Sequence, residues 1–119
     1  MEKPHKSLEV WKQSMDLVLE IYQVTKQFPN NEGYGIAMQI RRAAVSVPSN
    51  IAEGAARQTK KEFMNFLHIA QGSLSELDTQ IDIASRLEYI NLETRKRLDD
   101  KMQPVDKMIT GLIRRLSKK

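Results

Sequence analysis

The chain has 119 residues and a mass of 13.7 kDa, which is the length of one domain, and its 40% hydrophobic and 29% charged residues are typical of a globular protein. It has no cysteine, which excludes disulfides, thiolate nucleophiles and thiolate metal sites. No apolar run approaches the ~20 residues of a membrane span, and the first ten residues lack the apolar core of a secretory signal. We therefore expect one cytoplasmic domain over residues 1–119, with no membrane contact.

Charge is distributed unevenly along the chain. The formal net charge is +4, but residues 41–61 carry +4, residues 76–88 carry −3 and residues 95–119 carry +6. Two basic segments that flank an acidic one could guide a polyanion or order the subunits of an assembly. An ordinary solvated exterior of mixed sign is the alternative interpretation.

The first predicted helix covers about residues 8–27, with Ser7 as its N-cap and Phe28-Pro29 after its end. It carries two apolar stripes. One consists of Trp11, Met15, Val18 and Tyr22, and the other of Val10, Leu17, Ile21 and Val24. Together they cover much more than the ~100° arc of a single buried face. This helix is therefore expected to contact neighbours on more than one side.

The second predicted helix covers about residues 32–57 and contains a proline. Its apolar face runs from Ile36 to Val47 and continues beyond Pro48 to Ile51 and Ala55. A proline in a helix interior removes one backbone hydrogen bond and disfavours helical geometry at the preceding residue. Because the apolar face continues beyond it, we predict one helix with a kink at Pro48.

The third and fourth predicted helices cover about residues 60–88 and 92–116. Thr59 and Glu62 form a capping box at the start of the third, and Asn91 is a suitable N-cap for the fourth. Each carries an apolar seam at alternating spacings of four and three residues. The seams consist of Phe63, Leu67, Ala70, Leu74, Leu77, Ile81 and Ala84, and of Leu98, Met102, Val105, Ile109, Leu112 and Leu116. Four such helices with short connections predict an all-α, antiparallel, up-down-up-down four-helix bundle.

Residue patterns of known catalytic and cofactor sites are missing. A di-iron site in a bundle needs Glu-x-x-His, but the residue three positions before His68 is Asn65. His68 is placed opposite the seam of its helix, which predicts a surface position. No glycine-rich phosphate loop occurs. We expect no enzymatic activity, no catalytic residue, no metal, no cofactor and no small-molecule substrate.

A polar stripe on the second helix carries the most information. It contains Gln39, Arg42, Ser46, Ser49, Asn50, Glu53 and Arg57, and it separates the main apolar face from a second, smaller apolar arc. A buried stripe of this kind would have to satisfy its own polar groups, and it could fix the register between subunits. An exposed stripe would be an ordinary solvated face. The residues assigned to a motif or oligomer seam are Gln39, Arg42, Ser46, Pro48, Asn50, Glu53 and Gly54.

The same region resembles a known family. The residues that carry the resemblance around this helix are Phe28-Pro29, Glu32, Tyr34-Gly35, Gln39, Arg41 to Ala44, Ser46, Pro48, Asn50 to Gly54 and Arg57. The match continues in Phe63, Phe66-Leu67, Ile69-Ala70, Gly72 to Leu74 and Glu76-Leu77, and it includes Leu8 and Val10-Trp11. Over about residues 7–90 the sequence resembles the four-helix bundle proteins known as 23S rRNA intervening-sequence proteins, or the S23 family. This family is similar to the accessory proteins of diversity-generating retroelements, which are basic pentameric barrels that engage a reverse transcriptase and nucleic acid. The resemblance implies a homo-oligomer, a pentamer, without an active site.

Charge and resemblance together predict a homopentamer that binds structured RNA or a ribonucleoprotein through basic surfaces. Such binding would neutralise phosphates and release counterions. The basic residues expected to contact RNA are Arg41, Arg42, Arg57, Lys60, Lys61, Arg95, Lys96, Arg97, Arg114 and Arg115. The alternative is a protein-interaction scaffold whose charged residues serve subunit assembly without nucleic-acid binding.

Overall fold

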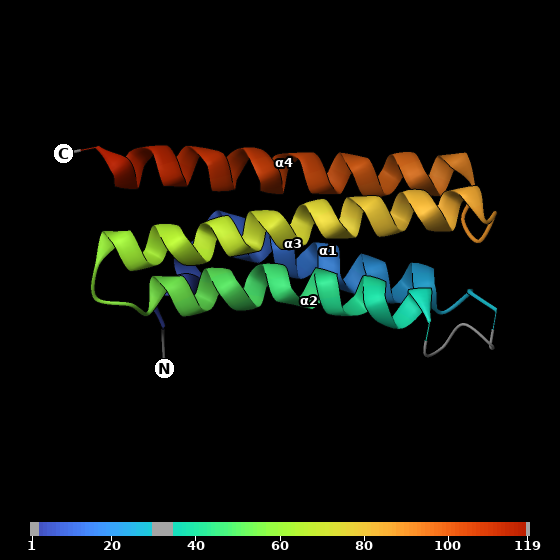
Figure 1. Cartoon of the computed structure of the whole chain (residues 1–119), viewed down its shortest axis with the longest axis horizontal. Coiled ribbons are helices and arrows are strands. Elements are labelled where there is room, and N and C mark those ends of the chain that lie inside the picture. The colour runs from blue at the N-terminus through green and yellow to red at the C-terminus, as the bar shows by residue number, and fades with distance from the viewer. Residues whose placement is uncertain (1–2, 30–34, 119) are drawn as a thin grey trace.

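The computed structural model describes residues 3–29 and 35–118. Within these residues a short 3-10 helix, η1 (Pro4–Ser7), precedes four α-helices: α1 (Glu9–Thr25), α2 (Ile36–Ala55), α3 (Lys60–Arg86) and α4 (Leu92–Ser117). The helices run alternately up and down the long axis, with extents of 48 × 26 × 19 Å (Figure 1). Packed pairs are α1 with α2, α2 with α3, α3 with α4, and α4 with α1. This is the predicted four-helix bundle.

Most predicted helix limits agree with the structure to within two residues. The predicted start of the second helix, at residue 32, lies outside the described residues. α2 continues through the buried Pro48 as a single helix, as predicted, while the kink expected there stays a prediction. Asn91 caps α4 as expected, because its side-chain oxygen accepts a hydrogen bond of 2.8 Å from the backbone N–H of Thr94.

The predicted N-cap of the first helix is wrong. Ser7 belongs to η1, and its hydroxyl donates a 3.1 Å hydrogen bond to the carbonyl oxygen of Pro4. Leu8, which has extended backbone angles, takes the N-cap position without a side-chain cap. The reason is local: Pro4 initiates a tight turn that uses the Ser7 hydroxyl, and a proline in a first turn loses no hydrogen bond. The turn packs η1 against α1 and α2.

The core confirms the two predicted seams. All residues of the α3 and α4 seams are buried except Phe63 and Leu116, which pack against the core from its edge. On α1, the stripe of Val10, Leu17, Ile21 and Val24 faces the core. The other stripe is divided: Trp11 and Val18 pack against the core from its edge, whereas Met15 and Tyr22 are each 39% exposed. The bundle therefore covers one apolar stripe of α1 fully and the other only in part.

α2 and α3 make the most extensive contact in the bundle, and Gly54 lies within it. A Cβ atom on Gly54 would lie 2.7 Å from Cβ of Phe66 and 2.9 Å from Cδ1 of Phe63. These separations are shorter than carbon atoms tolerate, so the backbone of α2 can approach α3 here only because residue 54 has no side chain. Gly54 was predicted to belong to a motif or oligomer seam, and the structure gives it a place in the contact of α2 with α3 within one chain, while a role between subunits stays a prediction.

Candidate nucleic-acid interface

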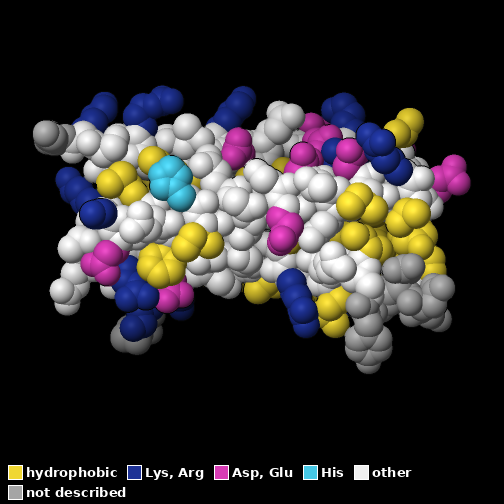
Figure 2. Space-filling view, viewed as in Figure 1, with side chains coloured by type: hydrophobic (Ala, Val, Ile, Leu, Met, Phe, Trp, Pro, Cys, Tyr) yellow, Lys and Arg dark blue, Asp and Glu magenta, His cyan; other side chains and the backbone are white. Residues whose placement is uncertain are grey.

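Several predicted RNA-contacting residues meet at one end of the bundle. α2 ends, α3 begins and α4 ends at this end, which also carries η1 (Figure 1). We define the basic end as Lys3, Lys6, Arg57, Lys60, Lys61, Arg114, Arg115 and Lys118. Figure 2 shows Lys and Arg side chains around this end, at the left of the view. Lys3, Lys6 and Lys118 were not predicted, because only the fold brings them beside residues that are distant in the sequence.

Most cations of the basic end are not neutralised by neighbours. Lys60, Lys61, Arg114 and Arg115 are exposed, and their side chains form no ion pair within residues 3–29 and 35–118. Arg57 is partly engaged, because it bonds Glu53 at 2.9 Å and lies 4.9 Å from the centre of the Phe66 ring. Exposed, unpaired cations are free to contact phosphate oxygens. This end can therefore attract a polyanion.

The carboxylates at the basic end are occupied locally. Glu62 accepts a 2.8 Å hydrogen bond from the Thr59 hydroxyl, which in turn accepts one of 3.1 Å from the Glu62 backbone N–H. Only half of the predicted capping box is therefore present: Thr59 caps the Glu62 backbone N–H, but Glu62 bonds the hydroxyl of Thr59 and not its backbone N–H. Glu9 accepts a 3.2 Å hydrogen bond from Gln13. Neither carboxylate forms an ion pair with Lys60 or Lys61 among the described residues.

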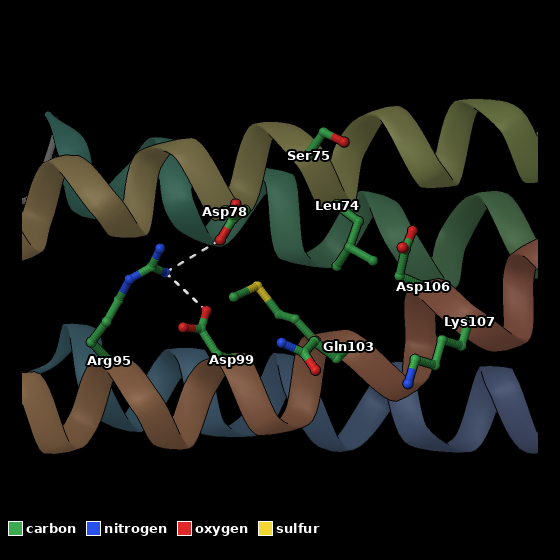
Figure 3. A pocket seen from close by; sticks show the side chains of 9 residues that line it. Leu74, Ser75, Asp78, Arg95, Asp99, Gln103, Asp106 and Lys107 are labelled. Carbon is green, nitrogen blue, oxygen red and sulfur yellow. Dashed lines mark hydrogen bonds and ion pairs between the residues drawn. The ribbon is translucent and has the colours of Figure 1, made fainter.

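Three further predicted residues lie elsewhere, in the N-terminal half of α4, where acidic side chains surround them. Arg95 is only 19% exposed and contacts Asp78 at 3.3 Å, Asp82 at 3.7 Å and Asp99 at 3.1 Å. It lies in a groove of about 410 Å³ between α3 and α4, where its guanidinium bridges the two helices (Figure 3). Here the acidic segment of α3 holds α4 in place.

The neighbours of Arg95 on α4 also have partners. Lys96 contacts Asp100 at 3.2 Å, and Arg97 donates a 2.6 Å hydrogen bond to Glu20 of α1. The basic segment 95–119 therefore divides into an ion-paired first part and an unpaired last part. Sequence alone could not separate the two fully, because three of the acidic partners, Asp78, Asp82 and Glu20, come from other helices.

Arg41 and Arg42 lie near the start of α2, away from the basic end. Arg41 donates a 2.8 Å hydrogen bond to Thr25 Oγ1 and lies 4.6 Å from the centre of the Tyr22 ring, so it links α2 to α1. Arg42 is exposed and forms no ion pair with the described residues. The two adjacent arginines therefore serve different surfaces.

The polar stripe of α2 is the seam between α2 and α3 at its centre and a solvated surface at its edges. The hydroxyls of Ser46 and Ser73 are 2.7 Å apart, and the Asn50 amide donates hydrogen bonds to the Ser46 carbonyl at 2.8 Å and to its hydroxyl at 2.9 Å. Gln39, Arg42 and Glu53 are exposed. Within one chain, this network therefore fixes how α3 packs along α2.

One buried polar group on this side of α3 was not anticipated. Gln80 lies two turns beyond Ser73 on the same face, is 9% exposed, and its Oε1 has no hydrogen-bond partner among the described residues. His68, in contrast, is exposed as predicted. Across residues 3–29 and 35–118, no three metal-ligating side chains of the His, Cys, Asp and Glu types gather at one place. Among the described helices, none is both long and apolar enough to cross a membrane.

Comparison with known proteins supports the resemblance seen in the sequence. The model of the 23S rRNA-intervening sequence protein family matches residues 6–111. A crystal structure from Bacteroides thetaiotaomicron, described as a protein of unknown function from the S23 ribosomal protein family, has a similar fold. The TM-score is 0.81 at 24% sequence identity, and the match covers 87% of this chain and 97% of that one. No curated protein matches the chain.

Proposed function

This chain belongs to the 23S rRNA-intervening sequence protein family, and we propose that it is a non-enzymatic, cytoplasmic homo-oligomer that binds structured RNA, free or within a ribonucleoprotein, through its basic end. The observation that carries the proposal is the gathering of exposed cations where three helices terminate, with Lys60, Lys61, Arg114 and Arg115 unpaired among the described residues. The family name alone carries little weight, because it reflects the gene location of some members.

The proposed mechanism is phosphate neutralisation. Each lysine or arginine that contacts a phosphate releases condensed counterions, and such contacts position a protein on a nucleic acid without reading its bases. The aromatic side chains near the basic end, Trp11, Phe63 and Phe66, are all partly buried, and Arg57 lies over the Phe66 ring, which argues against a platform for stacking single-stranded bases. A double-stranded or otherwise folded RNA is therefore the favoured ligand.

The proposed homo-oligomer is a pentamer. Resemblance to the pentameric retroelement accessory proteins supports this number, and the exposed side chains of Met15 and Tyr22 on α1 support self-association. Several copies of the basic end in one particle would raise the affinity for a long RNA, because later contacts become intramolecular once the first has formed.

A pair of double variants tests the RNA site. Lys60→Glu/Lys61→Glu changes the basic end, and Lys96→Glu/Lys101→Glu is the matched control because it changes the net charge equally in the half of α4 away from the basic end, where Lys96 pairs with Asp100. The probe is an RNA hairpin longer than the ~16 base pairs that a compact double-strand-binding domain spans. At ~50 mM salt we expect the first variant to bind at least tenfold more weakly in fluorescence anisotropy, and the control to bind within about twofold of the unmodified protein.

Two results would overturn this assignment. Equal losses in both variants would show that the net charge matters and its position does not. Undetectable binding of the hairpin by the unmodified protein at low salt would favour the second candidate function, a protein-interaction scaffold. The exposed apolar side chains of α1 and α3 are the observation that favours the scaffold.

A further inference from the structure

A small apolar pocket opens beside the basic end, between the start of α1 and the last turns of α4. Its volume is about 200 Å³, and Leu8, Val10, Met108 and Leu112 supply its apolar walls. Val10 and Leu112 belong to the buried core, and Leu8 and Met108 pack against it from the edge. An apolar cavity of ~150 Å³ holds a benzene molecule, whereas pockets for drug-sized ligands start at ~300 Å³. The pocket therefore has room for one aromatic ring.

A glycine keeps this pocket open. Gly111 lies in its wall, and a Cβ atom there would meet nothing within 4 Å. Gly54, by contrast, is required by the close approach of α2 to the side chains of α3. A glycine in a helix interior lowers stability relative to alanine, and packing among the described residues does not require a glycine at position 111. What the missing side chain provides here is access to the pocket.

One cation and one carboxylate also line the pocket. Arg115 is an exposed residue of the basic end and forms no ion pair among the described residues. Glu9 accepts a 3.2 Å hydrogen bond from the Gln13 amide. A carboxylate has about four acceptor positions, so Glu9 can also accept a hydrogen bond from an amino group on a ligand. The ring that suits this pocket therefore carries an amino group and arrives with an anionic group for Arg115.

A nucleotide whose base bears an amino group has both features. Arg114 and Lys118 are exposed on the same last turns of α4 as Arg115, so the phosphates on either side of such a nucleotide would also meet cations. A free nucleotide would leave most of these cations unused. In RNA, the bases of a paired stem are stacked and out of reach, whereas the bases of bulges and loops can be splayed out and held against a guanidinium plane.

From this geometry we infer that the pocket receives a single unpaired base of a stem that is bound at the basic end. The inference rests on the proposed function and names the RNA feature that the site selects, which is a base-paired stem interrupted by a bulge. It adds one base contact to the phosphate contacts. A base that is already unpaired costs least to flip out of a stem, so the bulge and not a paired base is the feature recognised.

Two RNA hairpins test the inference. They share a stem longer than ~16 base pairs and differ only in one unpaired cytidine within the stem of one of them. Cytidine is chosen because it has a single ring and an exocyclic amino group that carboxylates accept from. We define the bulge preference as the dissociation constant of the fully paired hairpin divided by that of the bulged hairpin, measured by fluorescence anisotropy at ~50 mM salt. As a ratio, it cancels changes that affect both RNAs equally.

Two glycine variants assign the preference to the pocket. Gly111→Leu fills the pocket without changing any charge, and Gly111→Val replaces it if the leucine variant loses its helical circular dichroism. Gly72→Leu is the matched control, because it makes the same change within α3, outside the pocket, where a Cβ atom also meets nothing within 4 Å. One stacked base strengthens binding by roughly fivefold to a hundredfold. We expect a bulge preference of at least about fivefold for the unmodified protein and for Gly72→Leu, the lower end of this range because the pocket has no aromatic wall.

For Gly111→Leu we expect a bulge preference near one, with the fully paired hairpin bound within about twofold of the unmodified protein because the phosphate contacts are unchanged. Equal binding of the two hairpins by the unmodified protein, or a preference that Gly111→Leu retains, would overturn the base site. Free cytidine 5′-monophosphate that binds as tightly as the bulged hairpin would overturn it too, because the pocket would then belong to a free nucleotide. An unmodified protein that binds neither hairpin would overturn the proposed function itself.

Discussion

Replacing Gly54 by valine is expected to lower the free energy of unfolding by about 3 kcal/mol. The new side chain would enter the space occupied by Phe63 and Phe66. A Cβ atom alone would already lie 2.7 Å from Cβ of Phe66 and 2.9 Å from Cδ1 of Phe63. Relief would require α2 to move away from α3 along the most extensive contact in the bundle. The small gain in helix propensity from glycine to valine, a few tenths of a kcal/mol, offsets little of this loss.

Chemical denaturation at one fixed protein concentration measures the effect, because self-association makes the apparent stability depend on concentration. Gly111→Val is the matched control, since Gly111 also lies within a helix but a Cβ atom there meets nothing within 4 Å. Its stability should stay within about 0.5 kcal/mol of the unmodified protein. Equal losses in the two variants would mean that α2 and α3 do not approach each other closely at Gly54.

Replacing Leu77 by alanine is expected to lower the free energy of unfolding by about 2–5 kcal/mol. Leu77 is 0% exposed at the middle of the α3 seam. Its loss removes buried apolar area and leaves a cavity that the long neighbouring helices cannot collapse to fill. Denaturation midpoints under the same conditions provide the measurement.

The control for this second variant is Leu92→Ala, which makes the same chemical change at a residue that is 81% exposed. The free energy of unfolding of this control should stay within about 0.5 kcal/mol of that of the unmodified protein. A loss below about 1 kcal/mol at Leu77 would contradict its place in a closely packed core.

The helical seams show how much of the fold the sequence determines. Heptad spacing identified the buried residues of α3 and α4 because a period near 3.5 residues leaves only one face that can pack continuously against neighbours. On α1 the pattern offered two apolar stripes and could not decide which faces the core. In the structure one stripe is buried, while the other is divided between Trp11 and Val18 at the edge of the core and the exposed Met15 and Tyr22. The Ser7 cap was wrong because a proline three residues earlier captured the Ser7 hydroxyl.

The candidate site was less predictable than the fold. Sequence identified the basic segments, but Arg95 and Arg115 look alike in the sequence although they lie in different environments. Arg95 meets three aspartates, two of them from α3, whereas Arg115 ends a helix without such partners among the described residues. Pairing across helices depends on the side-chain register of one helix against the next, which periodicity does not fix. The same holds for the polar stripe of α2. Its sequence does not tell the hydrogen-bonded centre from the exposed edges, because the partner Ser73 belongs to α3.

In the proposed function, one small chain uses separate surfaces to assemble and to bind RNA. The basic end lies at the helix termini, whereas the exposed apolar residues of α1 and α3, such as Met15 and Ile83, belong to helices that run along the length of the bundle (Figure 1). A ring built through the sides would present all of its basic ends without covering them. Its net charge would grow with each copy, which strengthens attraction for a polyanion.

The most direct measurement of the central claim is the affinity of the unmodified protein for the RNA hairpin as a function of salt. If the basic end contacts two or more phosphates, the dissociation constant should rise at least tenfold between ~50 and ~200 mM salt, with a linear dependence of its logarithm on the logarithm of the salt concentration. The slope should fall by about 1 for each contacting lysine that is removed, as Lys60→Glu/Lys61→Glu would show. An affinity that does not change with salt would contradict RNA binding through the basic end.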